Sequence, residues 1–241
     1  MTAAELRTAL KTLLDEDGVR RSDTIMDQSL SEGYTVMALM TQGAEVTHSY
    51  VINSSVYYWA LPDDFFVPIQ VLWNGARLWP ARMHDIDELS STWMSDSAAT
   101  PLYYWTIGSL GSAAQLWFYP VPAASGTLKL TYAMCPSPFG GDTETPRLPL
   151  EFHYGIVWYG YMWELLKERG SLLANKALRA LEEFVRHVNE CQAYVYRRTP
   201  DRDFAMKPWD AEAVRRKLHS FEQMLRQQPV TTQATVQEMA Q

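Results

Sequence analysis

The sequence predicts an α+β protein: a helical bundle built from N- and C-terminal helices, with an inserted antiparallel β-sheet or sandwich domain. Apolar residues recur at helical spacing before residue 44 and again after residue 150. Between these limits apolar and polar residues alternate, and Gly, Pro and Asn separate the runs as they do in strands and turns. We therefore divide the chain into a helical part (1–43), an inserted β domain (44–149), long helices that complete the bundle (150–228) and a polar tail (229–241).

Two helices are expected at the start of the chain. Over residues 3–16 the leucines have the spacing of one helical face, and Gly18 supplies a stop signal. Ser22 is a good N-cap residue, and the acidic Asp23 suits the first turn of a helix. We expect the second helix to run from there until Gly43 ends it.

The inserted segment contains the clearest local signals. Asn74-Gly75 lies between the apolar runs IQVLW and ARLWP, which predicts a hairpin with a type I′ turn. Pro62 cannot donate a hydrogen bond within a sheet, so a strand should end beside it. Further strands are expected over 102–108, 115–122 and 126–134, with a short helix or loop over 84–97. This gives roughly five or six antiparallel strands between residues 46 and 134.

Three helices are expected after residue 150. The segment 151–169 is apolar almost all round, which is typical of a helix buried on most sides. In the segment 172–198 apolar residues repeat every seven positions, but Gln192 interrupts the series. Both a coiled-coil seam and a helix packed in a bundle fit this pattern. Pro200 ends that helix, and one more amphipathic helix is expected over 209–228.

Composition and motifs argue against several classes of protein. No apolar run approaches the roughly 20 residues needed to cross a bilayer, and charges interrupt the N-terminal segment, so we expect no signal peptide. The histidines and the two cysteines lack the spacing of metal ligands, and no nucleophile motif is present. We therefore predict no catalytic residue, no cofactor, no metal and no membrane partner, in a cytoplasm-like compartment.

Several short motifs follow one another in a recognisable order. They are Leu61-Pro62-Asp63-Asp64-Phe65, Pro101-Leu102-Tyr103-Tyr104, Tyr119-Pro120-Val121-Pro122, Leu128–Tyr132, and Leu148-Pro149-Leu150-Glu151-Phe152-His153. Together they resemble the head-to-tail adaptor (connector) proteins of tailed bacteriophages, particularly the podovirus-like type. The likeness covers about residues 20 to 190. Ser31-Glu32-Gly33 departs from the Asn-Glu-Ala that this family often carries.

The resemblance implies a structural virion protein at the head–tail junction, assembled in the host cytoplasm. It implies a homo-oligomeric ring of about twelve subunits beneath the portal protein. The ring would join the portal to a tail or nozzle protein, and genomic DNA would pass through without specific binding. Two alternatives stay open: another tail or baseplate structural protein, and a carbohydrate-binding or hydrolytic β domain.

Aromatic residues are the candidates for subunit contacts, because aromatic side chains are enriched at interfaces. Trp59 and Phe65 flank the Leu-Pro corner. Trp158 and Trp163 lie five residues apart on the helix expected over 151–169, so they should face different directions.

The polar tail and the acidic front half supply the remaining candidates. Val230, Val236 and Met239 are the apolar anchors with which the tail would dock on the portal or on a neighbouring copy. Residues 1–150 contain eight Lys or Arg and sixteen Asp or Glu, so carboxylates would line the channel and repel DNA phosphate. The candidates are Asp15, Glu16, Asp17, Asp63, Asp64, Asp85 and Asp87.

Overall fold

The computed structural model describes residues 1–16, 19–108, 114–167 and 171–198. Its helices are α1 (Ala3–Glu16), α2 (Asp23–Thr41), α3 (Met83–Leu89), α4 (His153–Lys167) and α5 (Ser171–Arg198), with a 3-10 turn, η1 (Leu150–Phe152), before α4. Its strands are β1 (Glu45–Ile52), β2 (Tyr58–Ala60), β3 (Phe65–Trp73), β4 (Ala76–Arg77), β5 (Trp79–Pro80), β6 (Ser97–Ala98), β7 (Tyr103–Ile107), β8 (Gln115–Tyr119), β9 (Val121–Pro122) and β10 (Gly126–Met134). The predicted α+β class is confirmed. None of the described helices is long and apolar enough to cross a membrane.

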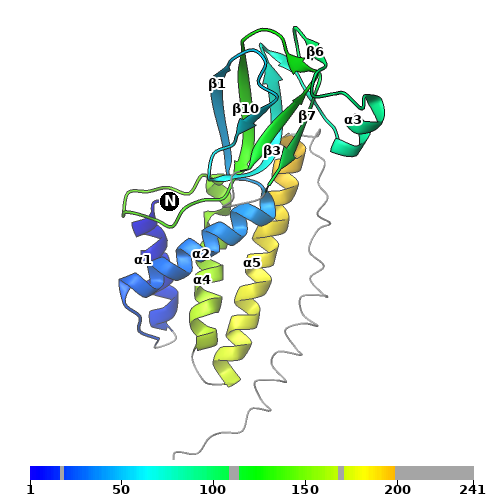
Figure 1. Cartoon of the computed structure of the whole chain (residues 1–241). Helices are drawn as coiled ribbons and strands as arrows, with labels where there is room; N and C mark the ends of the chain where they lie inside the picture. Colours follow the sequence, from blue (N-terminus) through cyan, green and yellow to red (C-terminus); the bar gives the residue numbers. More distant parts are fainter. Residues whose placement is uncertain (17–18, 109–113, 168–170, 199–241) are drawn as a thin grey trace, which may run out of the picture.

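Helices from both ends of the chain share one apolar core. Figure 1 shows α1, α2, α4 and α5 together on one side of the β unit. A Cβ atom added at Gly160 of α4 would lie 3.2 Å from Leu10 of α1 and 3.5 Å from Leu30 of α2. The missing side chain therefore lets three helices approach closely at this point.

The apolar residues that repeat every seven positions in α5 pack inside this bundle. Leu181, Val188 and Val195 are buried in the same core as the N-terminal helices. Gln192, which interrupts the repeat, donates from Nε2 to the backbone carbonyl oxygen of Met40 at 2.8 Å. The carbonyls in the last turn of a helix have no partner within it, so Gln192 satisfies one at the end of α2. The alternative of packing in a bundle is thus the one observed.

Two details at the ends of α2 differ from the prediction. Ser22 occupies the N-cap position with an extended backbone, but its side chain makes no capping hydrogen bond. At the other end the helix was expected to end at Gly43, but it ends at Thr41, and Gln42, with φ 51°, adopts the left-handed conformation. The space beside Gly43 is tight instead, because a Cβ atom there would lie 3.0 Å from the side chain of Leu148. The absence of a side chain at Gly43 therefore lets Leu148 pack closely against the end of α2.

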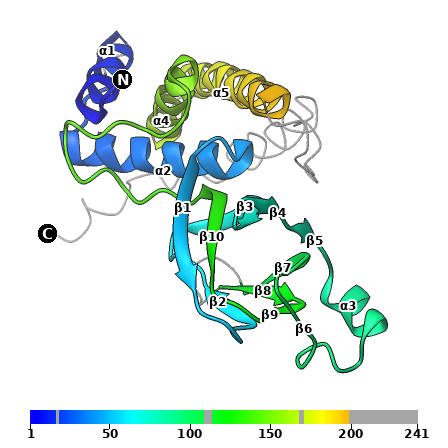
Figure 2. The same cartoon turned by 90° about the horizontal axis from the view of Figure 1, so that it is seen from above.

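The β unit is a sandwich of two four-stranded sheets, in the orders β1-β10-β3-β4 and β2-β8-β7-β5. Figure 2 shows the two sheets from above the view of Figure 1. Trp73 and Leu128 of the first sheet share a fully buried core with Leu116 and Phe118 of the second. The hairpin at Asn74-Gly75 forms as predicted: both residues have positive φ, 48° and 84°, and Trp73 pairs with Ala76.

The expectation of a purely antiparallel β domain was incomplete. β5 pairs with β7, and β6 pairs with β9, both in parallel. Parallel neighbours need a long crossover connection, and residues 81–102, which contain α3, supply it for β5 and β7. The sequence predicted only a short helix or loop over 84–97, yet Ile86 and Trp93 are buried against Trp105 on the outer face of the second sheet. Two-residue strands have no periodicity to detect, which explains why they were missed.

Candidate functional site

The Leu-Pro corner joins the two sheets and ties them to β10. The N–H of Phe65 donates to the carbonyl of Pro62 at 3.0 Å, which closes the turn. Asp64 accepts a hydrogen bond from the hydroxyl of Tyr132 at 2.8 Å, and its carbonyl accepts from the N–H of Cys135. Burial, reinforced by this carboxylate, raises the pKa of Tyr132. The corner is thus a rigid internal junction in which Asp64 has a structural partner.

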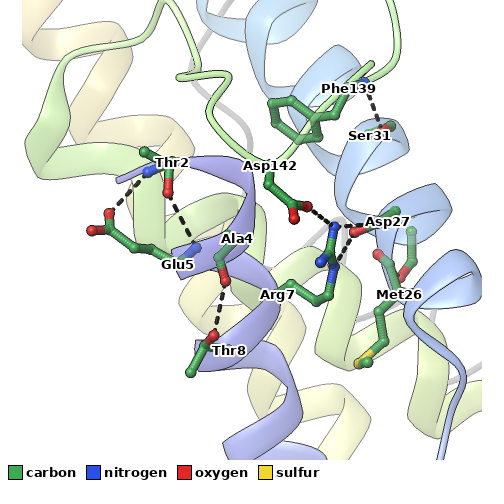
Figure 3. Close-up of polar contacts among 11 residues, drawn as sticks. Thr2, Ala4, Glu5, Arg7, Thr8, Met26, Asp27, Ser31, Phe139 and Asp142 are labelled. Carbon is green, nitrogen blue, oxygen red and sulfur yellow. Dashed lines mark hydrogen bonds and ion pairs between the residues drawn. The ribbon is translucent and has the colours of Figure 1, made fainter.

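Residues 135–149 form a strap that runs from β10 over α1 and α2 to η1. Figure 3 shows Arg7 of α1 at its centre. Its guanidinium binds both carboxylate oxygens of Asp27 on α2, at 2.6 and 2.8 Å, and Asp142 of the strap at 2.7 Å. Hydrogen bonds to Asp27 and then Asp142 raise the pKa of Arg7. Three separate segments therefore meet at one cation, a contact that the sequence spacing did not indicate.

The strap also supplies backbone partners for the helices. The N–H groups of Ala3 and Ala4 donate to the carbonyls of Glu144 and Asp142, at 2.7 and 3.1 Å. These are first-turn donors of α1 that have no partner within the helix. The sequence division placed residues 135–149 with the β domain, whereas Phe139 and Leu148 of the strap pack on the helical core.

A fully buried carboxylate lies at the far end of the bundle. Glu164 of α4 accepts from Nε of Arg21 at 2.8 Å and from Nζ of Lys167 at 2.7 Å. Arg21 lies in the connection between α1 and α2, so the pair fixes that connection to α4. Buried carboxylates are found where they are paired and hydrogen-bonded, and Glu164 meets both conditions.

A buried histidine connects the strap, α4 and the first residue of the chain. Nε2 of His153 donates to the carbonyl of Leu148 at 2.9 Å, which leaves Nδ1 to accept from the amino group of Met1 at 3.0 Å. Burial lowers the pKa of the imidazole. His153 was part of the motif at the start of the helix, and its role here is to hold that start against α1.

The aromatic candidates for subunit contacts differ in exposure. Phe65 is 5% exposed and packs against Tyr132 within the subunit's own core. Trp59 is half-buried beside the same core. Trp158 is also half-buried and packs on the helical core, whereas Trp163 is 40% exposed. Of these four side chains, Trp163 is therefore the most accessible to a neighbouring copy.

The acidic candidates are not brought together within one subunit. Asp15 lies near the end of α1, and Glu16 is the last residue of that helix; Asp17 lies outside the described residues. Asp63 is exposed at the Leu-Pro corner, beside the hydrogen-bonded Asp64. The last two candidates, Asp85 and Asp87, belong to α3, which lies on the side of the β unit opposite β1 in Figure 1. There Asp85 caps the helix, and Asp87 accepts from Nε1 of Trp93 at 2.8 Å.

The remaining expectations concern the C-terminal segment, metal ligands and the cysteines. Val230, Val236 and Met239 lie outside the described residues, as does the helix expected over 209–228. Within the described ranges no group of three or more His, Cys, Asp or Glu side chains could hold a metal. Cys191 is buried, which raises its thiol pKa to about 11.

Comparison with known proteins gives a family assignment. A family model described as SU10 adaptor protein matches residues 1–202. The match spans both sets of helices and the β unit between them. A search of curated proteins found no match to the sequence.

Proposed function

The chain belongs to the SU10 adaptor protein family, the head-to-tail adaptors of phages, and we propose that its copies form a ring that joins the portal to the tail. The family makes it a structural protein of the virion that associates with portal and tail proteins. The finer proposal is a closed ring of about twelve copies beneath the portal, through which DNA passes.

The family match over residues 1–202 is the observation that carries this proposal. It includes every described element, so the bundle and the β unit together belong to the adaptor. The corner, the strap and the shared core support it physically, because a subunit under load at a junction needs its two parts firmly connected. One such connection runs through the strap: the N–H of Arg147 donates to the hydroxyl of Tyr34 on α2 at 2.8 Å.

We propose that the exposed face of α4 around Trp163 contacts a neighbouring copy. The ring of Trp163 is stacked on Tyr159 at 6.5 Å between centroids, which holds it in place while 40% of the side chain stays exposed. Preorganised aromatic side chains of this kind often carry much of the binding free energy at interfaces.

Replacing two tryptophans in turn tests this contact. Trp163→Ala should leave the free energy of unfolding nearly unchanged and weaken ring formation. Trp158→Ala is the control, because its ring packs on the bundle core, and it should cost about 2 kcal/mol of stability, less than a fully buried Trp would. Equal ring formation by Trp163→Ala and the wild type would count against this interface.

We propose that acidic side chains face the DNA in the assembled ring. Asp15 lies near the end of α1, Asp63 at the Leu-Pro corner and Asp85 on α3, so the three carboxylates come from separate elements of the subunit. Carboxylates repel phosphate within about 8–10 Å at physiological salt. Tight binding of duplex DNA by the isolated protein, with a steep salt dependence, would contradict this arrangement.

The position of the protein in purified virions tests the adaptor role. A gold label on a C-terminal affinity tag, viewed by electron microscopy, should lie at the junction of head and tail. Copy number per virion, from quantitative mass spectrometry against the portal protein, should equal that of a single ring. A label at the tail tip would instead favour a baseplate component.

A further inference from the structure

β1 presents a long free edge at the side of the β unit opposite α3 (Figure 1). Its eight residues pair one-to-one with β10, from Glu45 with Ala133 to Ile52 with Gly126, without a bulge. Within the described part of the chain no strand pairs with β1 on its other side. Val51 on this strand is 73% exposed.

The direction of the free hydrogen-bonding groups follows from the pairing. The carbonyl of Ala44 accepts from Met134, so it faces β10. Successive residues of a strand alternate in direction, so the N–H and C=O groups of Thr47, Ser49 and Val51 face away from β10. The hydroxyls of Thr47 and Thr131 lie 2.9 Å apart, as expected for a pair that does not exchange backbone hydrogen bonds.

This edge lacks the features that normally prevent strands from pairing between molecules. Proteins protect edges with Pro, with bulges, with Lys or with very short strands. The free side of β3 has such protection, because it contains Pro68 and two register shifts. β1 has no Pro, no Lys and no bulge, and its only charged residue is Glu45 at the beginning. An edge of this kind is suited to receive a strand.

The incoming strand must come from somewhere other than β1 if copies are to close a ring. Pairing of β1 with β1 would be isologous and would stop at a dimer, whereas a ring needs a heterologous contact. Of the other edge strands, β2 has three residues, and β4, β5, β6 and β9 have two each. None of these described edges matches the length of β1.

The 43 residues after Arg198 contain one segment that does match. Residues 230–236, VTTQATV, follow Pro229 and contain no charge, Pro or Gly. Five of the seven are Val or Thr, the β-branched residues that favour strands. As a strand, this segment would place all its apolar residues, Val230, Ala234 and Val236, on one face together with Thr232. Thr231, Gln233 and Thr235 would lie on the other face, so one face could be buried and the other exposed.

We propose that residues 230–236 of one copy add to the free edge of β1 in the neighbouring copy, so that each subunit donates one strand and accepts one. This inference rests on the proposed ring. It assigns Val230 and Val236 to a contact between copies.

Ring formation by the full-length chain with the portal ring present, followed by mass photometry, tests the proposal. Ser49→Pro removes an outward N–H but none of the hydrogen bonds between β1 and β10, so the fold should be kept. Ser49→Ala keeps the N–H and is the matched control. Val51→Lys places a charge on the exposed edge and serves as a second variant if the proline harms folding. Circular dichroism checks the fold of each variant.

We expect Ser49→Pro, Val51→Lys and deletion of residues 229–241 each to raise the protein concentration needed for rings by at least about tenfold, since each removes part of one strand pairing. Ser49→Ala should have no effect. The deletion combined with Ser49→Pro should be no worse than either change alone, because both act on one interaction.

Two results would overturn the inference while leaving the ring intact. One is normal ring formation by well-folded Ser49→Pro and Val51→Lys. The other is a double variant whose loss is the product of the single losses, which would place the tail and β1 in separate contacts. If the wild-type chain forms no ring with its portal, the proposed ring fails, and this strand exchange fails with it.

Discussion

Glu164 offers a direct test of how the bundle is held together at its far end. The change Glu164→Gln keeps the shape of the side chain and removes its charge. The side chain of Glu164 is fully buried and that of Arg21 is 16% exposed, and Nε of Arg21 lies 2.8 Å from the Glu164 carboxylate. The change therefore removes the charge of the carboxylate that faces the largely buried guanidinium of Arg21.

The size of the effect follows from this burial. Removing one partner of a fully buried pair costs about 3–5 kcal/mol. The Gln carbonyl can still accept one hydrogen bond and Arg21 retains some contact with water, so we expect a loss of about 2–4 kcal/mol in the free energy of unfolding. For a chain of this size, that lowers the melting temperature by about 5–15 °C.

The assay is urea unfolding followed by circular dichroism at 222 nm, which reports on the helices. Glu190→Gln is the control, because Glu190 and its partner Arg186 are both about half exposed. That variant should change stability by less than about 0.5 kcal/mol. If Glu164→Gln is as stable as the control, the buried pair does not fix the α1–α2 connection as we describe.

Three further variants test other parts of the account. Gly126→Ala should lose about 1–3 kcal/mol by thermal unfolding, because its Cβ atom would lie 2.4 Å from the ring of Trp73; Gly141→Ala, with open space around it, should be neutral. Burial lowers the pKa of His153, so its part of the stability is present above about pH 6.5 and is lost as the pH falls toward the lower folded pKa. Urea midpoints between pH 7.5 and 5.5 should therefore fall more steeply for the wild type than for His153→Gln, and equal slopes would exclude this role. Gln192→Ala should cost about 1 kcal/mol in urea unfolding by freeing a carbonyl at the end of α2, and a cost near zero would remove that role.

Features set by neighbouring residues could be predicted from the sequence. The turn at Asn74-Gly75 and the limits of α1 follow from local conformational preferences and spacing. The motifs from Leu61 to His153 indicated the correct family. Each motif is weak alone, but their order along the chain is specific. The helical bundle followed from the apolar periodicity before residue 44 and after residue 150.

Features set by distant residues could not be predicted. Arg7 and Asp142 are 135 positions apart, and no local pattern indicates that they meet. The parallel pairing of β5 with β7 depends on a crossover rather than on periodicity. The free edge of β1 is a property of the sheet order, so it became visible only when the partners of each strand were known.

The proposed function requires that copies of this adaptor close into one ring on the portal. Native mass spectrometry of the full-length chain mixed with its portal ring measures this directly. We expect one dominant complex that contains a fixed number of adaptor copies, about twelve, on each portal ring. A continuous distribution of bound copies, or a portal that binds none, would contradict it.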